Sequence, residues 1–246
     1  MSELPLSSYG RKIGMNAWNL GKLFGIQIRV HWTFLILPIW VYFSTILAGS
    51  GVAMGVVAIL FTLAIFGCVL FHELGHALAA RQFGILTRNI TLLPIGGVAA
   101  LERMPRKSLQ VLWIAVAGPL VNVAIALTLA FGLLLIPLPT ESVILAFVKN
   151  LVVANVILVV FNMIPAFPMD GGRVLRSLLA MKMDYVRATQ IAATVGQVFA
   201  IGLGLLGLFL GDVLLVLIGC FVFFAARAEK NFVAARPLDD LDPAHP

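Results

Sequence analysis

Two histidines and a glutamate stand together in an apolar stretch of the sequence, in the pattern His-Glu-Leu-Gly-His at residues 72–76. On a helix, residues four apart share one face, so His72 and His76 can bind the same metal ion. Glu73 points in a neighbouring direction, where its carboxylate can take a proton from a water molecule that the metal activates. The pattern predicts a zinc hydrolase site, with a coincidence or a purely structural polar network as the alternatives. Ionisable side chains in membrane segments are functional by default, which favours the site.

A catalytic zinc site usually needs a third protein ligand and an open position for water. The best candidate is Asp170, the only acidic residue between Lys149 and Lys182. Two prolines end the preceding helix, so the chain around Asp170 leaves regular structure and exposes polar backbone. A short helix is expected to follow at residues 174–181, and capping such a helix is a common use of Asp. The residues therefore leave two roles open for Asp170, a metal ligand and a helix cap.

Other polar side chains in the apolar segments have several possible roles. Asn162 lies seven residues after Asn155, so both share a helical face. Their amides could donate to the oxyanion formed in amide hydrolysis, or could hydrogen-bond between helices. Cys68 is interpreted as a small buried hydrophobic residue, and His31 beside a tryptophan as an interfacial anchor. The role of Asn122 is left open.

The composition predicts an integral membrane protein of one domain. The chain has 246 residues, of which 61% are hydrophobic and 11% charged, and its mean hydropathy is +1.05. Soluble domains carry about a quarter charged residues. Six apolar runs approach the length of about 20 residues that a helical span needs. They cover residues 31–48, 52–82, 109–137, 149–164, 189–210 and 213–226. The expected fold class is an all-α polytopic membrane protein with about six transmembrane helices.

The positive charges predict the orientation of these spans. Lys and Arg residues gather before the first run, between the second and third, between the fourth and fifth, and after the sixth. The alternate loops have none until Lys149. The positive-inside rule then places both termini in the cytoplasm, and it puts the two histidines and Asp170 near the cytoplasmic face. The net charge of +6 is interpreted as this topology signal, so no nucleic acid partner is expected.

Two segments on the expected cytoplasmic side resemble strands. Residues 24–31 alternate apolar and polar side chains with a period of two, and residues 87–104 carry β-branched residues around a Pro-Ile-Gly-Gly turn. The second segment predicts a small β-hairpin or a re-entrant loop. It could offer a strand edge to an extended substrate, or it could seal the cytoplasmic side. The expected division is a cytoplasmic N-terminal segment with an interfacial strand at residues 1–30, a membrane core at 31–230 and a short cytoplasmic tail at 231–246.

Together these residues resemble the site-2 protease family of intramembrane zinc metalloproteases, peptidase family M50. That family carries HExxH on one transmembrane helix and NxxPxxxxDG on another, and residues 72–76 and 162–171 match every fixed position. The segments at residues 31–34, 94–99 and 117–122 look like further signatures of the sporulation-protease-like branch. The motifs are not separated by a PDZ-like insertion, and the chain ends too soon for the paired CBS modules of many members.

The resemblance implies one Zn²⁺ per chain, bound by His72, His76 and Asp170, with Glu73 as the general base. Asn162 is the candidate that stabilises the oxyanion. The implied function is cleavage of transmembrane protein substrates near the cytoplasmic face, within the lipid bilayer of a prokaryotic plasma membrane. Homo-oligomer formation is left open.

Two other functions compete with proteolysis. A transporter or ion channel could use His72, Glu73 and Asp170 as a cation path. Transporters usually show repeated halves, and the sequence has no apparent internal repeat. The third hypothesis is a membrane binding protein without catalysis, and the intact motifs argue against it.

Overall fold

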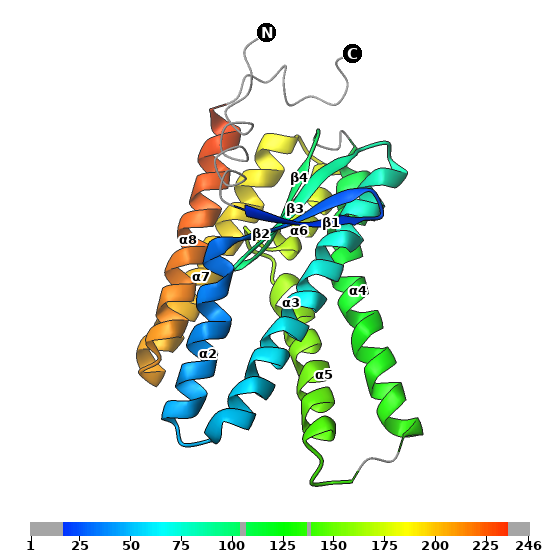
Figure 1. The fold of residues 1–246 in the computed structure, drawn as a ribbon. Coiled ribbons are helices and arrows are strands. Elements are labelled where there is room, and N and C mark those ends of the chain that lie inside the picture. The colour runs from blue at the N-terminus through cyan, green and yellow to red at the C-terminus, as the bar shows by residue number, and fades with distance from the viewer. Residues whose placement is uncertain (1–16, 104–106, 137–138, 236–246) are drawn as a thin grey trace. The chain divides into compact units, whose positions relative to one another are not determined.

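The computed structural model describes residues 17–103, 107–136 and 139–235 (Figure 1). The predicted N-terminal segment up to residue 16 and the predicted tail from residue 236 lie outside these described residues. The elements in chain order are β1 (Ala17–Leu23), β2 (Ile26–His31), η1 (Trp32–Leu35), α2 (Ile36–Leu47), α3 (Gly51–Gln82), β3 (Thr87–Leu93), β4 (Gly96–Leu101), α4 (Ser108–Leu135), α5 (Val143–Asn162), α6 (Asp170–Ala180), α7 (Tyr185–Leu210) and α8 (Val213–Ala234).

The chain divides into two compact units. The first comprises Met1–Met104 and Leu120–Ile157, and the second comprises Pro105–Pro119 and Leu158–Pro246. The first unit therefore holds the strands, α2, α3 and most of α4 and α5. The second holds α6, α7 and α8. The expected pattern of a mostly helical chain with a small sheet is confirmed.

The four strands of the first unit form one sheet in the order β1-β2-β3-β4. The pairs β1–β2 and β3–β4 are antiparallel, whereas β2 and β3 are parallel, with Ile28 opposite Ile90. A parallel pair needs a long crossover connection, which η1, α2 and α3 supply here. The predicted strand at residues 24–31 and the predicted hairpin at 87–104 are confirmed. The pairing of the two segments was not predicted.

Strand β1 was also not predicted, and its exposure gives the reason. All of its residues after Ala17 are exposed, so neither face carries an apolar alternation, and a bulge between Asn19 and Gly21 breaks the register. Strand β2, by contrast, alternates buried and half-buried residues along its whole length. Period two appears in a sequence only where one face of a strand is buried.

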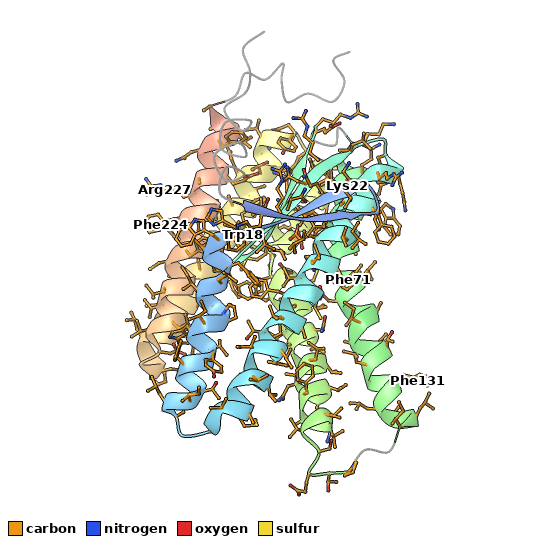
Figure 2. The ribbon with its side chains drawn as sticks, in the orientation of Figure 1. Trp18, Lys22, Phe71, Phe131, Phe224 and Arg227 are labelled. Carbon is orange, nitrogen blue, oxygen red and sulfur yellow. The ribbon has the colours of Figure 1, made fainter. Side chains whose placement is uncertain are left out.

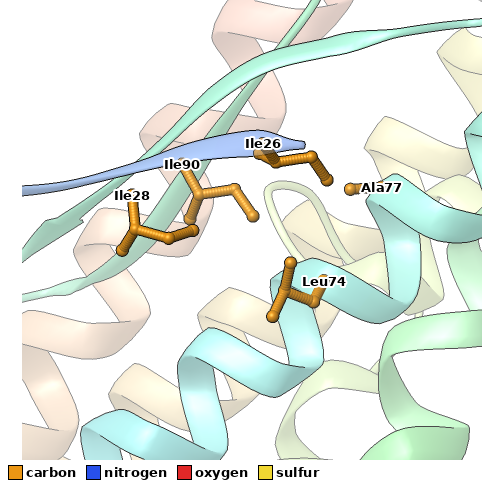
Figure 3. Close-up of a cluster of buried hydrophobic side chains, with 5 residues drawn as sticks. All are labelled: Ile26, Ile28, Leu74, Ala77 and Ile90. Atoms are coloured by element: carbon orange, nitrogen blue, oxygen red, sulfur yellow. The ribbon is translucent and has the colours of Figure 1, made fainter. Parts of the chain in front are cut away.

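The sheet is attached to α3 through a compact apolar cluster. Figure 3 shows Ile26, Ile28 and Ile90 from β2 and β3 facing Leu74 and Ala77 of α3. Leu74 is 2% exposed and lies inside the His-Glu-Leu-Gly-His pattern. Burying an aliphatic side chain of this size contributes about 1.5–3 kcal/mol. The same helix turn therefore carries both the sheet contact and the candidate metal ligands.

A second cluster extends this contact toward the start of α2. It contains Val30, Leu92, Phe34 and Phe66, and the two phenylalanine rings pack edge to face with centroids 4.7 Å apart. Edge-to-face aromatic pairs stabilise a core by about 0.5–1.5 kcal/mol beyond area burial. The two clusters hold the sheet against α3 along several turns.

Four helices of the described residues are long and apolar enough to cross a membrane, namely α3, α4, α5 and α7. Large apolar side chains stand exposed on such helices, as Phe131 of α4 does, and also on α8, as Phe224 does (Figure 2). Contiguous exposed apolar surface of this kind suits lipid contact. The apolar stretch Trp32–Leu47 is shorter, and α8 carries three charged residues close to its C-terminal end. The count of six spans therefore stays a prediction.

Several helix ends differ from the prediction, most clearly those of α5 and α8. Helix α5 begins at Val143, six residues before the expected start at Lys149. Lys149 lies exposed within the helix and does not mark its boundary. Helix α8 continues to Ala234, into the predicted tail.

The second unit is held by close approach of its helix backbones. A Cβ atom placed on Gly219 of α8 would lie 2.9 Å from the carbonyl oxygen of Ala200 and 2.9 Å from the nitrogen of Gly204 in α7. Small residues at helix contacts are the usual means of association in lipid, where there is no hydrophobic driving force between helices. The two helices thereby form a tight antiparallel pair.

Candidate metal site

His72 and His76 form a buried pair on one face of α3, as their spacing predicts. Their Nε2 atoms are 3.0 Å apart, and the rings cross at 84°. The side chains are 5% and 8% exposed. Two nitrogens that bind one tetrahedral zinc at about 2.0–2.1 Å are separated by about 3.3 Å, so the pair is close to the arrangement that a shared ion requires.

Glu73 lies against strand β4 of the sheet. A Cβ atom placed on Gly97 would be 2.6 Å from Glu73 Cγ and 3.4 Å from its Oε1. Only a glycine at position 97 leaves room for the carboxylate side chain in this position. Among the strands of the described residues, β4 is the last in the sheet, so Glu73 lies beside an edge strand.

A chain of hydrogen bonds runs from His72 to two other helices. His72 Nδ1 is 2.5 Å from Asn122 Oδ1, and Asn122 Nδ2 donates to Asn155 Oδ1 over 2.8 Å. Asn155 Nδ2 donates to Cys68 Sγ over 3.3 Å and to the carbonyl oxygen of Leu151 over 2.8 Å. Both asparagine side chains are fully buried.

The sequence left the role of Asn122 open and gave two alternatives for Asn155. The structure confirms the interhelical hydrogen-bonding alternative for Asn155, and it confirms that Cys68 is buried. The contact between Asn122 and His72 was missed because it depends on how α3 and α4 are rotated about their axes. The available signal was a polar residue in an apolar run, which usually seeks a partner on another helix.

Asp170 is the first residue of α6 in the second unit. The N-cap residue is Met169, which has extended backbone and no side-chain cap hydrogen bond. The capping alternative for Asp170 is therefore not borne out, because α6 begins at Asp170 itself, four residues earlier than the expected start at residue 174. Asp170 is 6% exposed. A carboxylate in the first turn of a helix is stabilised by the helix dipole.

The loop before Asp170 folds tightly over the first turn of α6. A Cβ atom on Gly171 would collide with the backbone carbonyl groups of Met163 and Ile164. A Cβ atom on Gly172 would lie 2.7 Å from the carbonyl carbon of Ala166. The two glycines after Asp170 are thus required by the fold of this loop, which sets the position of the carboxylate.

A buried arginine on α6 was not singled out from the sequence. Arg176 pairs with Glu229 of α8 over 2.7 Å, and its guanidinium carbon is 5.3 Å from the ring centroid of Phe167 and 5.0 Å from that of Tyr185. The prediction used Arg176 only as a charge that reports topology. Glu229 lies 53 residues further along the chain, so the spacing carried no signal for this ion pair.

The two remaining candidates make local contacts. Asn162 is the last residue of α5 and donates to the carbonyl oxygen of Leu158 over 2.9 Å. Its role in catalysis stays a prediction. His31 accepts from the backbone nitrogen of Thr33 over 3.4 Å and lies 2.7 Å from its hydroxyl, so it caps η1.

Comparison with known proteins shows the family of the chain. The sequence model of peptidase family M50 matches residues 60–139 and 138–203. The chain is 37% identical over 216 residues to Zinc metalloprotease MJ0392 of Methanocaldococcus jannaschii, which covers 87% of this chain and 60% of that protein. It is 30% identical over 204 residues to Stage IV sporulation protein FB of Bacillus subtilis, which covers 82% of this chain and 68% of that protein.

A solved structure gives the same result. The Site-2 Protease from Methanocaldococcus jannaschii superimposes with a TM-score of 0.63 at 35% identity, over 87% of this chain and 95% of that one. The chain belongs to peptidase family M50, and its resemblance to the site-2 proteases is confirmed. It is a multi-pass membrane protein. It spans about 60% of the length of the first curated relative.

Proposed function

We propose that this protein is a zinc-dependent intramembrane endopeptidase that cleaves transmembrane proteins near the cytoplasmic face. The observation that carries the proposal is the buried pair of imidazole nitrogens, 3.0 Å apart, with Glu73 beside them on an apolar helix of 32 residues. Membership of peptidase family M50 supports the same activity.

The donor set fits zinc. His72 and His76 supply two imidazole nitrogens, Asp170 supplies the third ligand as a carboxylate oxygen, and all three side chains are buried. Two histidines with one carboxylate leave an open position, as in other catalytic zinc sites. When bound, zinc supplies a Lewis acid that polarises a carbonyl group and lowers the pKa of water to about 7.

The residues of the chain then move the protons. The Glu73 carboxylate takes a proton from water and passes it to the leaving amine of the peptide bond. Its contact with Gly97 restricts where that carboxylate can lie. Asn162 is the proposed donor to the substrate oxyanion, an interaction worth several kcal/mol where it occurs.

A transmembrane substrate must unwind before it can be cleaved, because a helix keeps its carbonyl groups in internal hydrogen bonds. The free edge of β4 is the proposed docking place for the extended segment, since a peptide can add to a sheet edge as a further strand. This edge passes beside Glu73 through Gly97.

We infer that Trp32–Leu47 and α8 also cross the membrane, which gives six spans with cytoplasmic termini. The distribution of Lys and Arg between the apolar runs supports this topology. The matched relatives come from an archaeon and a bacterium, which supports a prokaryotic plasma membrane.

Comparative membrane proteomics tests the proposed activity. Cells that carry the wild-type protein are compared with cells that carry Glu73→Gln, in which the general base is lost and the metal ligands are kept. Membrane-embedded fragments or intact single-span proteins are expected to accumulate in the variant. Identical membrane proteomes, or zinc-dependent ion transport by the purified protein without any cleavage, would contradict the proposal.

A further inference from the structure

Hydrogen bonds link Leu151, Asn155, Asn122 and His72, and the donor and the acceptor of each bond are fixed. We propose that Asn122 and Asn155 are positioning residues that hold the His72 proton on Nδ1 and present Nε2 to the metal. The inference deepens the proposed function, because it concerns the same zinc ligand. We call these two asparagines, together with Cys68, the asparagine relay.

The direction begins at the carbonyl oxygen of Leu151. A carbonyl group can only accept, so the amide nitrogen of Asn155 must face it, at 2.8 Å. The same nitrogen reaches Cys68 Sγ at 3.3 Å. The amide oxygen of Asn155 is thereby turned toward Asn122. The opposite amide orientation would place two oxygen atoms against each other at Leu151.

The next two bonds follow from this orientation. Asn155 Oδ1 accepts from Asn122 Nδ2 over 2.8 Å, so Asn122 Oδ1 faces His72 Nδ1 at 2.5 Å. An amide oxygen has no proton to give, so the imidazole must donate. A neutral imidazole carries one N–H, and the lone pair is then on Nε2, the atom that lies 3.0 Å from His76 Nε2.

The surroundings make this relay stiff. Asn122 and Asn155 are 0% exposed and lie on apolar helices α4 and α5. A buried amide group that loses its partner finds no water to replace it, so rotation of either side chain is unfavourable. An outer partner of this kind usually fixes the tautomer and ring orientation of a ligating histidine. If the two asparagines served only to pack α4 against α5, the bond between them would suffice. The further bond from Asn122 to the His72 imidazole would then have no purpose.

The tautomer can be measured without any metal. The metal-free protein is labelled with ¹⁵N-histidine and reconstituted in detergent or nanodiscs. We expect the ¹⁵N NMR signals of His72 to show a protonated Nδ1 and an unprotonated Nε2. The His72→Gln spectrum assigns the signals. Asn122→Leu is expected to abolish this preference, while Thr62→Val leaves it unchanged. Thr62 is the control because it is buried on α3, the helix that carries His72, and its hydroxyl donates to the carbonyl oxygen of Ala58 in that helix. A protonated Nε2 in the wild type would overturn the proposal.

Zinc affinity gives the second readout, by competition with a chelator. Loss of an outer partner typically weakens metal binding about 10–100-fold, so we expect that range for Asn122→Leu and a smaller loss for Asn155→Leu. Asn122→Asp keeps an acceptor oxygen for Nδ1 but loses the donor to Asn155, so it is expected to restore part of the affinity. The melting temperature of each metal-free variant identifies any that fail to fold, and Asn155→Leu then replaces Asn122→Leu.

The outcomes separate the two proposals. If the wild type binds zinc and the asparagine variants bind it equally well, the relay proposal is wrong and the protease proposal stands. If the wild type binds no zinc, the protease proposal fails, and the tautomer of His72 still decides the relay.

Discussion

The two units hold their candidate ligands by different means. In the first unit, His72 is held by a hydrogen bond to Asn122 of α4, which is itself bonded to Asn155 of α5, and α3 is held by an apolar contact with the sheet. In the second unit, Asp170 is held by a backbone loop that packs directly on Gly171 and Gly172. Side-chain contacts tolerate an isosteric replacement that keeps the hydrogen bond, whereas a backbone contact tolerates no added atom. The difference predicts which kinds of substitution each unit tolerates.

The largest effect is expected for Gly171→Ala in the second unit. The added methyl group collides with two backbone carbonyl groups, which cannot move as a flexible side chain can. Overpacking of this kind costs about 1–3 kcal/mol and occasionally more, and because two backbone carbonyl groups stand in the way we expect a loss above this range and above that of every substitution below. Denaturant titration in detergent measures the loss. Gly202→Ala in α7 is the control, because a Cβ there meets no atom within 4 Å. Equal stability of the two variants would refute the difference between the units.

The next effect is expected for Leu74→Ala in the first unit. The side chain fills the contact between α3 and the sheet, and Leu-to-Ala substitutions in such places cost about 2–5 kcal/mol. The same titration measures it, with Leu60→Ala as the control on the same helix, since Leu60 is 54% exposed. A loss at position 60 as large as that at position 74 would show that sheet packing is not the cause.

A smaller effect is expected for Arg176→Met, which tests whether side chains also matter in the second unit. The substitution removes the ion pair with Glu229 and two cation–π contacts, and we expect a loss of about 1–3 kcal/mol. Adding Glu229→Met should recover part of it, because the unpaired carboxylate is then removed as well. A double variant less stable than the single one would exclude the pair as the cause.

The smallest effect on stability is expected for Gly97→Ala, which acts on Glu73 alone. The free energy of unfolding should fall by less than about 1 kcal/mol, because the atoms nearest to the added methyl group belong to the flexible side chain of Glu73. Cleavage should fall roughly tenfold or more, since small misplacements of a catalytic group are costly, while zinc affinity stays unchanged. Val98→Ala, on the same strand, is the control. Unchanged cleavage in Gly97→Ala would show that the contact does not position Glu73.

The features that could be predicted from the sequence are those set by residues close together in the chain. Helix α3 and its histidine pair were predictable because residues four apart on a helix always share a face. The β-hairpin was predictable because turn residues separate two strand-like runs. These features depend on neighbours in the chain. Asp170 was proposed as the third ligand from its type and its family motif. The start of its helix was misplaced because a close contact of Gly171 and Gly172 with the preceding loop determines it.

Features that depend on the rotation and pairing of distant elements could not be predicted. Asn122 and Asn155 lie 33 residues apart and meet only after α4 and α5 pack together. Arg176 and Glu229 are separated by 53 residues and meet through α6 and α8. Strand β1 carries no alternation, because neither of its faces is buried. In each case the residue types were visible, but the partner was not.

The central claim is that one zinc ion is bound by His72, His76 and Asp170 while Glu73 serves only as a base. The most direct test is the zinc content of the purified full chain, measured by mass spectrometry together with cleavage of a single-span substrate. We predict one zinc per chain in the wild type and in Glu73→Gln, with no cleavage in the latter, and loss of zinc in His76→Leu and in Asp170→Leu. Full zinc content in both ligand variants, or full cleavage by Glu73→Gln, would contradict the account.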